Sequence, residues 1–222
     1  MHPTSAAHIN VFLVPMMRLS PDQALAKLLD GNADFVAGRL TSPATMLERR
    51  SATATAPDPF AMVLTCADSR VIPEQIFNCT IGDLFVCRVA GNFLEPAMLG
   101  SLEYAVLNFK STAVLFVLGH QRCAAIAATI SGVSAPGSID TIVAAIRPVV
   151  ETTQRGEMSP DEYVDAVVRA NAVHVARSIV KKSAIVRDAI AAKNLKVVAA
   201  RYSVDSGEVT LLGNPLTGLA VG

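Results

Sequence analysis

Three side chains that can bind a metal ion stand in two short segments of this 222-residue chain: Cys66 in the first, and His120 and Cys123 in the second. Two thiolates and one imidazole are typical zinc ligands, and the spacing of His120 and Cys123 allows both to face one ion. Structural zinc sites usually take four protein ligands, whereas catalytic sites take three and leave a position for water. The residue types therefore predict a zinc site with an open position, where the pKa of a bound water falls from about 15.7 to near 7.

A carboxylate and a guanidinium, Asp68 and Arg70, closely follow the first cysteine. A nearby cation keeps a carboxylate ionised because it lowers the carboxylate's pKa. An ionised carboxylate beside the metal can accept a hydrogen bond from the bound hydroxide and orient it, and such outer-shell partners commonly change activity by about 10–100-fold. We therefore predict that Asp68 and Arg70 form a catalytic dyad.

The two segments lie 54 positions apart, from Cys66 to His120, so the fold must bring them together. Apolar runs of the kind found in buried parallel strands cover residues 61–65, 84–90, 113–118 and 197–200. Helical patterns cover residues 73–78, 96–109, 121–131 and 138–192, the last with a break at 156–160, and residues 208–212 form a final strand. The alternation predicts an α/β fold: a mainly parallel central sheet of about four strands plus a C-terminal edge strand, flanked by helices.

This fold places both segments at one edge of the sheet. Cys66 comes at the carboxyl end of the first strand and His120 just after the third, and open α/β sheets bind ligands outside the carboxyl ends of their strands. An N-terminal helical arm precedes the sheet. Ser20 and Gln23 form a capping-box pattern at its start, and we expect the helix to end near Gly31.

Composition limits the partners of this chain. Lysine plus arginine equals aspartate plus glutamate at 19 each, and the chain is 51% hydrophobic and only 17% charged. The zero net charge gives no attraction to nucleic acid, and the apolar run at 9–17 is too short to span a bilayer, so we expect neither nucleic acid nor membrane as a partner. A surface poor in charge favours a homo-oligomer in which subunits cover apolar area.

The length favours one domain over residues 18–222. Residues 1–17 are expected to be a disordered extension or to result from a mis-assigned start. They lack a basic n-region and a small-residue cleavage site, so no signal peptide is expected and the protein is predicted to be cytoplasmic. All four cysteines are expected to be reduced, with Cys79 and Cys87 acting as small buried apolar residues.

Longer segments extend the two motifs. The segment Cys66–Asn92, CADSRVIPEQIFNCTIGDLFVCRVAGN, resembles the most diagnostic stretch of the beta-class carbonic anhydrases. Residues 100–106, GSLEYAV, and Gly119-His120 followed by Cys123 are also similar to that family. The resemblance covers roughly residues 18–213, which is most of the chain.

The resemblance implies the reversible hydration of carbon dioxide to bicarbonate and a proton, by attack of zinc-bound hydroxide. It implies one Zn²⁺ per subunit, held by Cys66, His120 and Cys123, with Asp68 and Arg70 as the dyad. It also implies a homodimer or homotetramer with active sites near the subunit interface.

Carbon dioxide is small and apolar, so its pocket should be dry rather than charged. By position in the family, the residues expected to line that pocket are Phe85, Ala90, Tyr104 and Ala124. Phe85 and Ala90 are equally well interpreted as core residues around the second strand.

Two alternatives stay open. Some relatives hydrolyse carbonyl sulfide or carbon disulfide with the same kind of site, and pocket shape would select the substrate. Ala124 follows Cys123 where the family usually has glycine, and Pro57 stands where many members carry a glutamine, so the substrate space differs. The other alternative is a catalytically silent zinc-binding structural or regulatory homologue, in which a side chain fills the fourth position.

Overall fold

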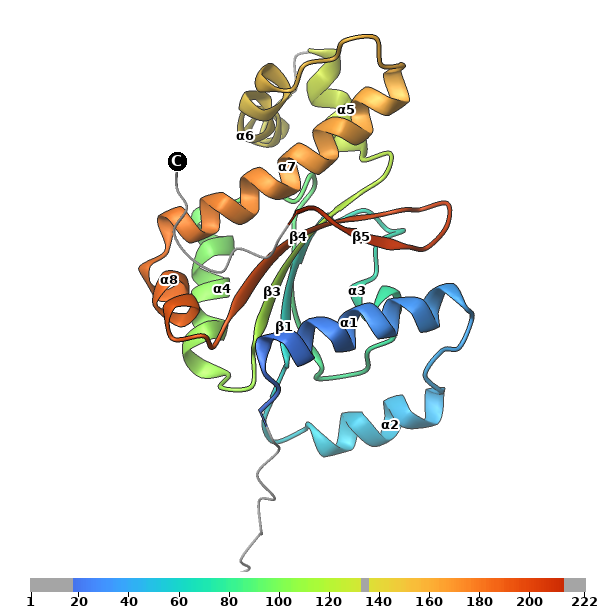
Figure 1. Ribbon diagram of the computed structural model, residues 1–222, viewed down its shortest axis with the longest axis vertical. Coiled ribbons are helices and arrows are strands. Elements are labelled where there is room, and N and C mark those ends of the chain that lie inside the picture. The colour runs from blue at the N-terminus through green and yellow to red at the C-terminus, as the bar shows by residue number, and fades with distance from the viewer. Residues whose placement is uncertain (1–17, 133–135, 214–222) are drawn as a thin grey trace, which may run out of the picture.

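The computed structural model describes residues 18–132 and 136–213, and five strands form one sheet in the order β2-β1-β3-β4-β5 (Figure 1). The strands are β1 (Ala61–Thr65), β2 (Leu84–Arg88), β3 (Val114–His120), β4 (Lys196–Tyr202) and β5 (Val209–Leu211). The first four are parallel and β5 runs antiparallel to β4, which confirms the predicted fold. The second strand ends at Arg88 rather than at residue 90, because the chain turns there and the Asn92 N–H donates to the carbonyl of Val89.

Helices surround this sheet within the described residues. They are α1 (Pro21–Val36), α2 (Pro43–Ala52), α3 (Pro73–Ile76), α4 (Pro96–Asn108), α5 (Ala124–Ser131), α6 (Ile139–Thr152), α7 (Pro160–Lys182) and α8 (Ala184–Ala191). The predicted break in the long helical region separates α6 from α7. A second, unpredicted break occurs at Ser183, whose hydroxyl starts α8 by accepting a hydrogen bond from the Val186 N–H at 3.1 Å.

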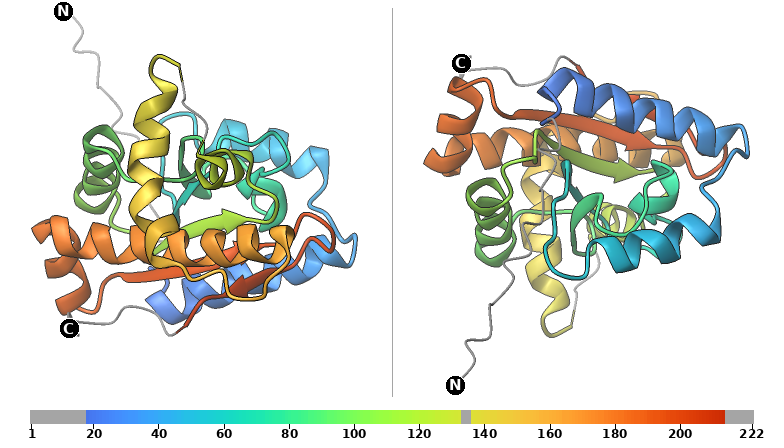
Figure 2. Two further views of the ribbon diagram at one scale, coloured as in Figure 1. Left: turned by 90° about the horizontal axis from the view of Figure 1, so that it is seen from above. Right: turned by 90° about the horizontal axis from the view of Figure 1, so that it is seen from below.

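Helices cover both faces of the sheet (Figure 2), and a core of buried apolar side chains lies on each face. β1 and β3 are buried along their whole length, as expected of parallel strands between helices. Because successive side chains of a strand point to opposite faces, Met62 and Leu64 pack with α4, α7 and α8, whereas Ala61 and Val63 pack with α1 and α3. Packing on both faces holds the strands in place, and so fixes the positions of the residues at their carboxyl ends.

The predicted start of the N-terminal helix is confirmed. The Gln23 N–H donates to the Ser20 hydroxyl at 3.2 Å and the Ser20 N–H donates to the Gln23 side chain at 2.8 Å. The expectation that this helix ends near Gly31 is wrong, since α1 continues to Val36. Gly31 serves close packing instead: a Cβ there would lie 2.0 Å from the carbonyl oxygen of Phe77. α2 carries no buried residue and is the exposed part of the N-terminal helical segment.

A third apolar cluster lies beyond the carboxyl ends of the strands. α5, α6 and the first half of α7 cover this edge of the sheet, at the top of Figure 1. The cluster contains Cys66 and Cys123 together with Ile126, Ile146 and Val167. Both segments that were predicted to carry chemistry therefore lie under one helical cover.

The predicted extension, residues 1–17, lies outside the described residues. Among the described helices, none combines the length and the apolar character that a bilayer crossing requires.

Candidate metal centre

Three buried side chains meet at the carboxyl edge of the sheet. Cys66 follows β1, His120 ends β3 and Cys123 is the N-cap residue of α5. β1 and β3 are neighbouring parallel strands in which Thr65 pairs with Leu118, so their ends lie side by side. The three ligand atoms lie within 4.8 Å of one another, and the two sulfurs are 4.0 Å apart. The structure brings the three predicted ligands together.

The two ring nitrogens of His120 have different surroundings. Nδ1 lies 3.0 Å from the carbonyl oxygen of Gln121, so Nδ1 carries the proton and donates it to that oxygen. Nε2 is buried and has no hydrogen-bond partner among the described residues. Buried polar atoms nearly always have a partner, and metal-bound histidines commonly donate their second N–H to a carbonyl or carboxylate. A metal ion at Nε2 accounts for both observations, so the donor set fits a metal.

The two cysteines of the cluster differ in acidity because they compete for one proton. The hydrogen bond with Cys123 lowers the pKa of Cys66, and so does the Gly91 N–H, whose nitrogen lies 3.2 Å from the Cys66 sulfur. The same contact with Cys66, together with burial, raises the pKa of Cys123. The thiolate is the metal-binding form, so a cation between the sulfurs would release the remaining proton.

Arg70 holds Asp68 in a bidentate ion pair. Its Nε donates to Oδ1 at 2.9 Å, its Nη2 donates to Oδ2 at 2.7 Å, and its backbone N–H donates to Oδ1 at 2.9 Å. These hydrogen bonds hold the pKa of Asp68 well below its usual range, so the carboxylate is ionised. Asp68 Oδ2 lies 3.9 Å from Nε2 of His120. The predicted pairing of Asp68 with Arg70 is therefore present beside the cluster, and its catalytic role stays a prediction.

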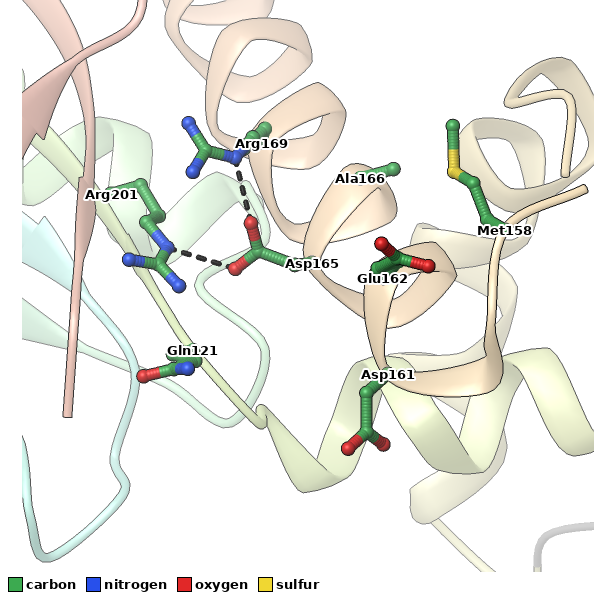
Figure 3. Close-up of a pocket in the computed structure, with 8 residues that line it drawn as sticks. All are labelled: Gln121, Met158, Asp161, Glu162, Asp165, Ala166, Arg169 and Arg201. Carbon is green, nitrogen blue, oxygen red and sulfur yellow. Dashed lines mark hydrogen bonds and ion pairs between the residues drawn. The ribbon is translucent and has the colours of Figure 1, made fainter. Parts of the chain in front are cut away.

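A surface hollow of about 470 Å³ has Gln121, the residue after His120, in its lining but none of the three cluster residues (Figure 3). Its lining residues are Gln121, Met158, Asp161, Glu162, Asp165, Ala166, Arg169 and Arg201. Asp165 accepts hydrogen bonds from Arg169 Nε at 2.7 Å and from Arg201 Nε at 2.8 Å. Asp165 thus pairs with both arginines of the hollow, and none of its lining residues belongs to the metal-binding cluster. The cluster remains the candidate site.

Comparison with known proteins agrees with this geometry. A family model described as carbonic anhydrase matches residues 61–209, which contain the cluster and the dyad. The chain belongs to the carbonic anhydrase family. A solved Coccomyxa beta-carbonic anhydrase, in complex with acetazolamide, is similar to it with a TM-score of 0.71 and 29% identity, covering 87% of this chain and 88% of that one. The predicted resemblance to the beta class is confirmed.

Two curated relatives match along almost their whole length. Carbonic anhydrase 2 of Mycobacterium tuberculosis is 34% identical over 200 residues, which cover 88% of this chain and 95% of the relative. The carbonic anhydrase of Mycolicibacterium smegmatis is 35% identical over 204 residues, with the same coverage.

Two of the residues predicted to line a carbonic anhydrase pocket adjoin the cluster. Ala124 is exposed and directly follows Cys123. Ala90 directly precedes Gly91, the residue whose N–H reaches Cys66. Both carry small side chains, and their contact with substrate stays a prediction.

The other two predicted pocket residues lie away from the cluster of their own chain. Phe85 pairs with Met62, four residues before Cys66, and so lies about 13 Å back along the sheet at about 3.3 Å per residue. Its ring packs at 5.7 Å from that of Phe109, and the ring of Tyr104 packs at 5.8 Å from the same Phe109. These residues form an aromatic group beside the edge strand β2.

Sequence reasoning gave no role to Arg88 and Gly91, although both lie within the diagnostic segment. Arg88 Nε donates to the Cys66 carbonyl at 3.1 Å and its Nη2 donates to the Asp68 carbonyl at 2.7 Å, so it braces the backbone of the ligand and the dyad. Arg88 could have been found from the sequence, because it is a charged residue at the end of an otherwise apolar strand. No feature of the sequence indicates the hydrogen bond from the Gly91 N–H to the Cys66 sulfur.

Proposed function

We propose that this chain catalyses the reversible hydration of carbon dioxide to bicarbonate and a proton, with one zinc ion per subunit held by Cys66, His120 and Cys123. The observation that carries the proposal is the buried cluster of two sulfurs and an unpartnered imidazole nitrogen, in a chain of the carbonic anhydrase family. Relatives at 34% and 35% identity bear the name carbonic anhydrase. Hydrolysis of carbonyl sulfide or carbon disulfide, and a silent homologue, are therefore not favoured.

Zinc is the metal that suits this donor set. Thiolate and imidazole ligands select zinc among the common divalent ions, and three side chains leave one tetrahedral position open. In such a site zinc lowers the pKa of water from about 15.7 to near 7 and so supplies a nucleophile at neutral pH. The Gln121 carbonyl fixes the tautomer and the ring orientation of His120.

The dyad acts as a positioned acceptor in this proposal. Because Asp68 is ionised, it can accept a hydrogen bond from the attacking solvent molecule but cannot donate one. This hydrogen bond orients the solvent molecule so that its lone pair points at the carbon of CO₂. Arg70 contributes by keeping the carboxylate charged and by fixing both of its oxygens. The distance of 3.9 Å from Asp68 Oδ2 to His120 Nε2 supports this role, because it places the carboxylate next to the cluster.

The small side chains of Ala90 and Ala124 next to the cluster suit a small apolar substrate. We propose that Phe85 and Tyr104 contribute to substrate space across a subunit interface, since each lies at the rim of the sheet rather than at its own cluster. Tyr104 is 55% exposed, and such a large apolar ring is well suited to cover by another subunit.

We propose that the chain forms a homodimer or homotetramer through the same edge. β2 is the first strand of the sheet and has no neighbour on its outer side among the described residues. Beside Tyr104, Leu107 is 65% exposed, and Ile81 just before β2 is 43% exposed. A second copy of the chain on this edge would bury these side chains and the free backbone groups of the strand.

We also propose a cytoplasmic location and a single catalytic domain over residues 18–222. The four cysteines are free and buried, and thiolate ligands persist in a reducing compartment.

The direct test is a stopped-flow assay of CO₂ hydration by the purified full chain, with metal analysis of the same sample and a parallel assay of sulfide release from carbonyl sulfide. We expect one zinc per chain and CO₂ hydration that stops when a chelator removes the metal and returns with added zinc. Sulfide release without CO₂ hydration, or a zinc-loaded chain with neither activity, would contradict the proposal.

A further inference from the structure

A buried amide reaches the metal cluster through a single residue. Asn171 on α7 is 1% exposed, and its Nδ2 donates to the carbonyl oxygen of Gly91 at 3.0 Å. The N–H of Gly91 donates in turn to the sulfur of Cys66 at 3.2 Å. A side chain 80 positions further along the sequence is thereby linked to one of the proposed ligands.

Gly91 has no side chain of its own to hold it in place. Its φ is +76°, and a Cβ on it would lie 2.6 Å from Cδ1 of Ile146 and 3.1 Å from Cβ of Ala125. The next residue, Asn92, also has a positive φ, of 41°. The backbone of this turn is therefore pressed against α5 and α6, and its hydrogen bonds determine where its N–H points.

Packing alone does not account for an amide at position 171. Val167, Val168, Ala172 and Val175 of the same helix are buried and apolar. Oδ1 of Asn171 has no hydrogen-bond partner among the described residues, and burying an unsatisfied polar atom is unfavourable. An apolar residue of similar size would avoid that cost. The bond to Gly91 is the contact for which the amide is needed.

We propose that Asn171 is a positioning residue of the metal centre: it holds Gly91 so that the Gly91 N–H stays on the Cys66 sulfur. The proposal rests on the metal site of the proposed function. A hydrogen bond to a thiolate withdraws electron density from the sulfur and orders the ligand, and outer-shell partners of this kind commonly change metal affinity by about 10–100-fold.

The test replaces the amide by an apolar residue of similar size and reads the thiolate directly. The full-length Asn171→Leu variant and the parent are loaded with cobalt(II), and the sulfur-to-cobalt charge-transfer absorption is recorded. Zinc affinity is measured by competition with a chromophoric chelator. We expect the charge-transfer band of Asn171→Leu to move to longer wavelength, because the Cys66 sulfur without its hydrogen bond is more electron-rich. We also expect the Kd for zinc to be about tenfold higher than in the parent, because Cys66 is less well ordered.

Asn32→Leu is the matched control. Asn32 is also a buried amide, 6% exposed, and donates to the carbonyls of Ile76 and Gly207 at 3.0 and 2.8 Å, away from the cluster. We expect this variant to lose stability and to keep the parent spectrum and zinc affinity.

A folded Asn171→Leu variant with the parent's spectrum and affinity would overturn the inference, and so would an equal shift in Asn32→Leu. If leucine prevents folding, Asn171→Ala applies the same two readouts to a smaller side chain. The proposed function fails separately: a parent that shows the thiolate-to-cobalt band without hydrating CO₂ refutes the activity and leaves this inference standing. A parent without the band overturns both.

Discussion

Cys66 and Cys79 are equally buried, at 4% and 5% exposure, but their surroundings give them opposite chemistry. The sulfur of Cys66 accepts a hydrogen bond from the Gly91 N–H and lies 4.0 Å from the sulfur of Cys123, and these contacts lower its pKa. The sulfur of Cys79 donates to the Phe77 carbonyl at 3.4 Å, and burial raises its pKa to about 12. Burial alone keeps a thiol protonated and inert.

The difference comes from where each thiol lies in the fold. Cys79 belongs to the apolar core on the α1 face of the sheet. Cys66 and Cys123 lie at the carboxyl edge, where a turn presents an N–H to the first and the N-terminus of α5 begins at the second. Backbone N–H groups at a helix N-terminus favour negative charge. A buried cysteine is therefore suited to bind a metal where hydrogen-bond donors and further metal-binding side chains lie close to its sulfur.

The largest expected effect is that of removing one sulfur of the cluster. We expect Cys66→Ser to lose the metal and to reduce CO₂ hydration by more than about 100-fold, beyond the range typical of outer-shell changes. Metal content per chain and stopped-flow rates measure this directly. Cys87→Ala removes a core sulfur whose pKa burial raises, and it should keep both metal and rate. Full metal content in Cys66→Ser would contradict the distinction between a metal-binding Cys66 and a structural Cys79.

Changing the dyad should separate metal binding from turnover. We expect Asp68→Asn to keep its zinc and to lose about 10–100-fold in kcat, because the amide cannot replace the ionised acceptor. Asp205→Asn is the control. Asp205 also pairs with an arginine at this edge of the sheet, since it accepts hydrogen bonds from Arg122 at 2.8 and 2.5 Å. Unlike Asp68, its side chain is 55% exposed. Equal activity in Asp68→Asn and the parent would show that the dyad has no part in turnover.

Thiol labelling should order the cysteines by thiolate content rather than by exposure. After chelation of the metal, iodoacetamide at pH 7 should modify Cys66 at least about tenfold faster than Cys79, because the thiolate is the nucleophile and only Cys66 has a lowered pKa. Added zinc should protect Cys66. Peptide mass spectrometry measures both, and equal labelling of the two cysteines would contradict the assigned surroundings.

The smallest effect is expected in the core. Cys79→Ala should lower the free energy of unfolding by about 1 kcal/mol through the small cavity it leaves, with CO₂ hydration changed less than about twofold. Denaturant unfolding and the same rate assay test this. A loss of metal in this variant would mean that Cys79 is not a purely structural residue.

The ligands and the dyad could be predicted from sequence because their chemistry is local. Cys66 directly follows one apolar strand and His120 ends another, and parallel strands carry their carboxyl ends to one edge. The Asp68 and Arg70 pair needs only two positions of separation for its bidentate contact. Residue type and strand position were sufficient to bring these four residues together, and Cys123 lies only three positions after His120.

Contacts made at long range through the backbone could not be predicted. Asn171 reaches Gly91 across 80 positions and bonds to a carbonyl, which every residue has. In the sequence, Gly31 suggests the end of a helix. In the structure, it is a packing position, because the Phe77 carbonyl oxygen occupies the space that a side chain would need. Phe85 was predicted to line the pocket by its position in the family, but its distance from the cluster of its own chain depends on the register of β2 against β1.

The central claim is a metal held by two sulfurs and one imidazole nitrogen, with a fourth position that no side chain fills. Zinc K-edge X-ray absorption of the purified parent and of Asp68→Asn tests it most directly. We predict two sulfur neighbours at about 2.3 Å and two nitrogen or oxygen neighbours at about 2.0–2.1 Å, in a shell that Asp68→Asn leaves unchanged. A third sulfur, a second imidazole, or a shell that loses an oxygen when Asp68 is replaced would contradict the claim.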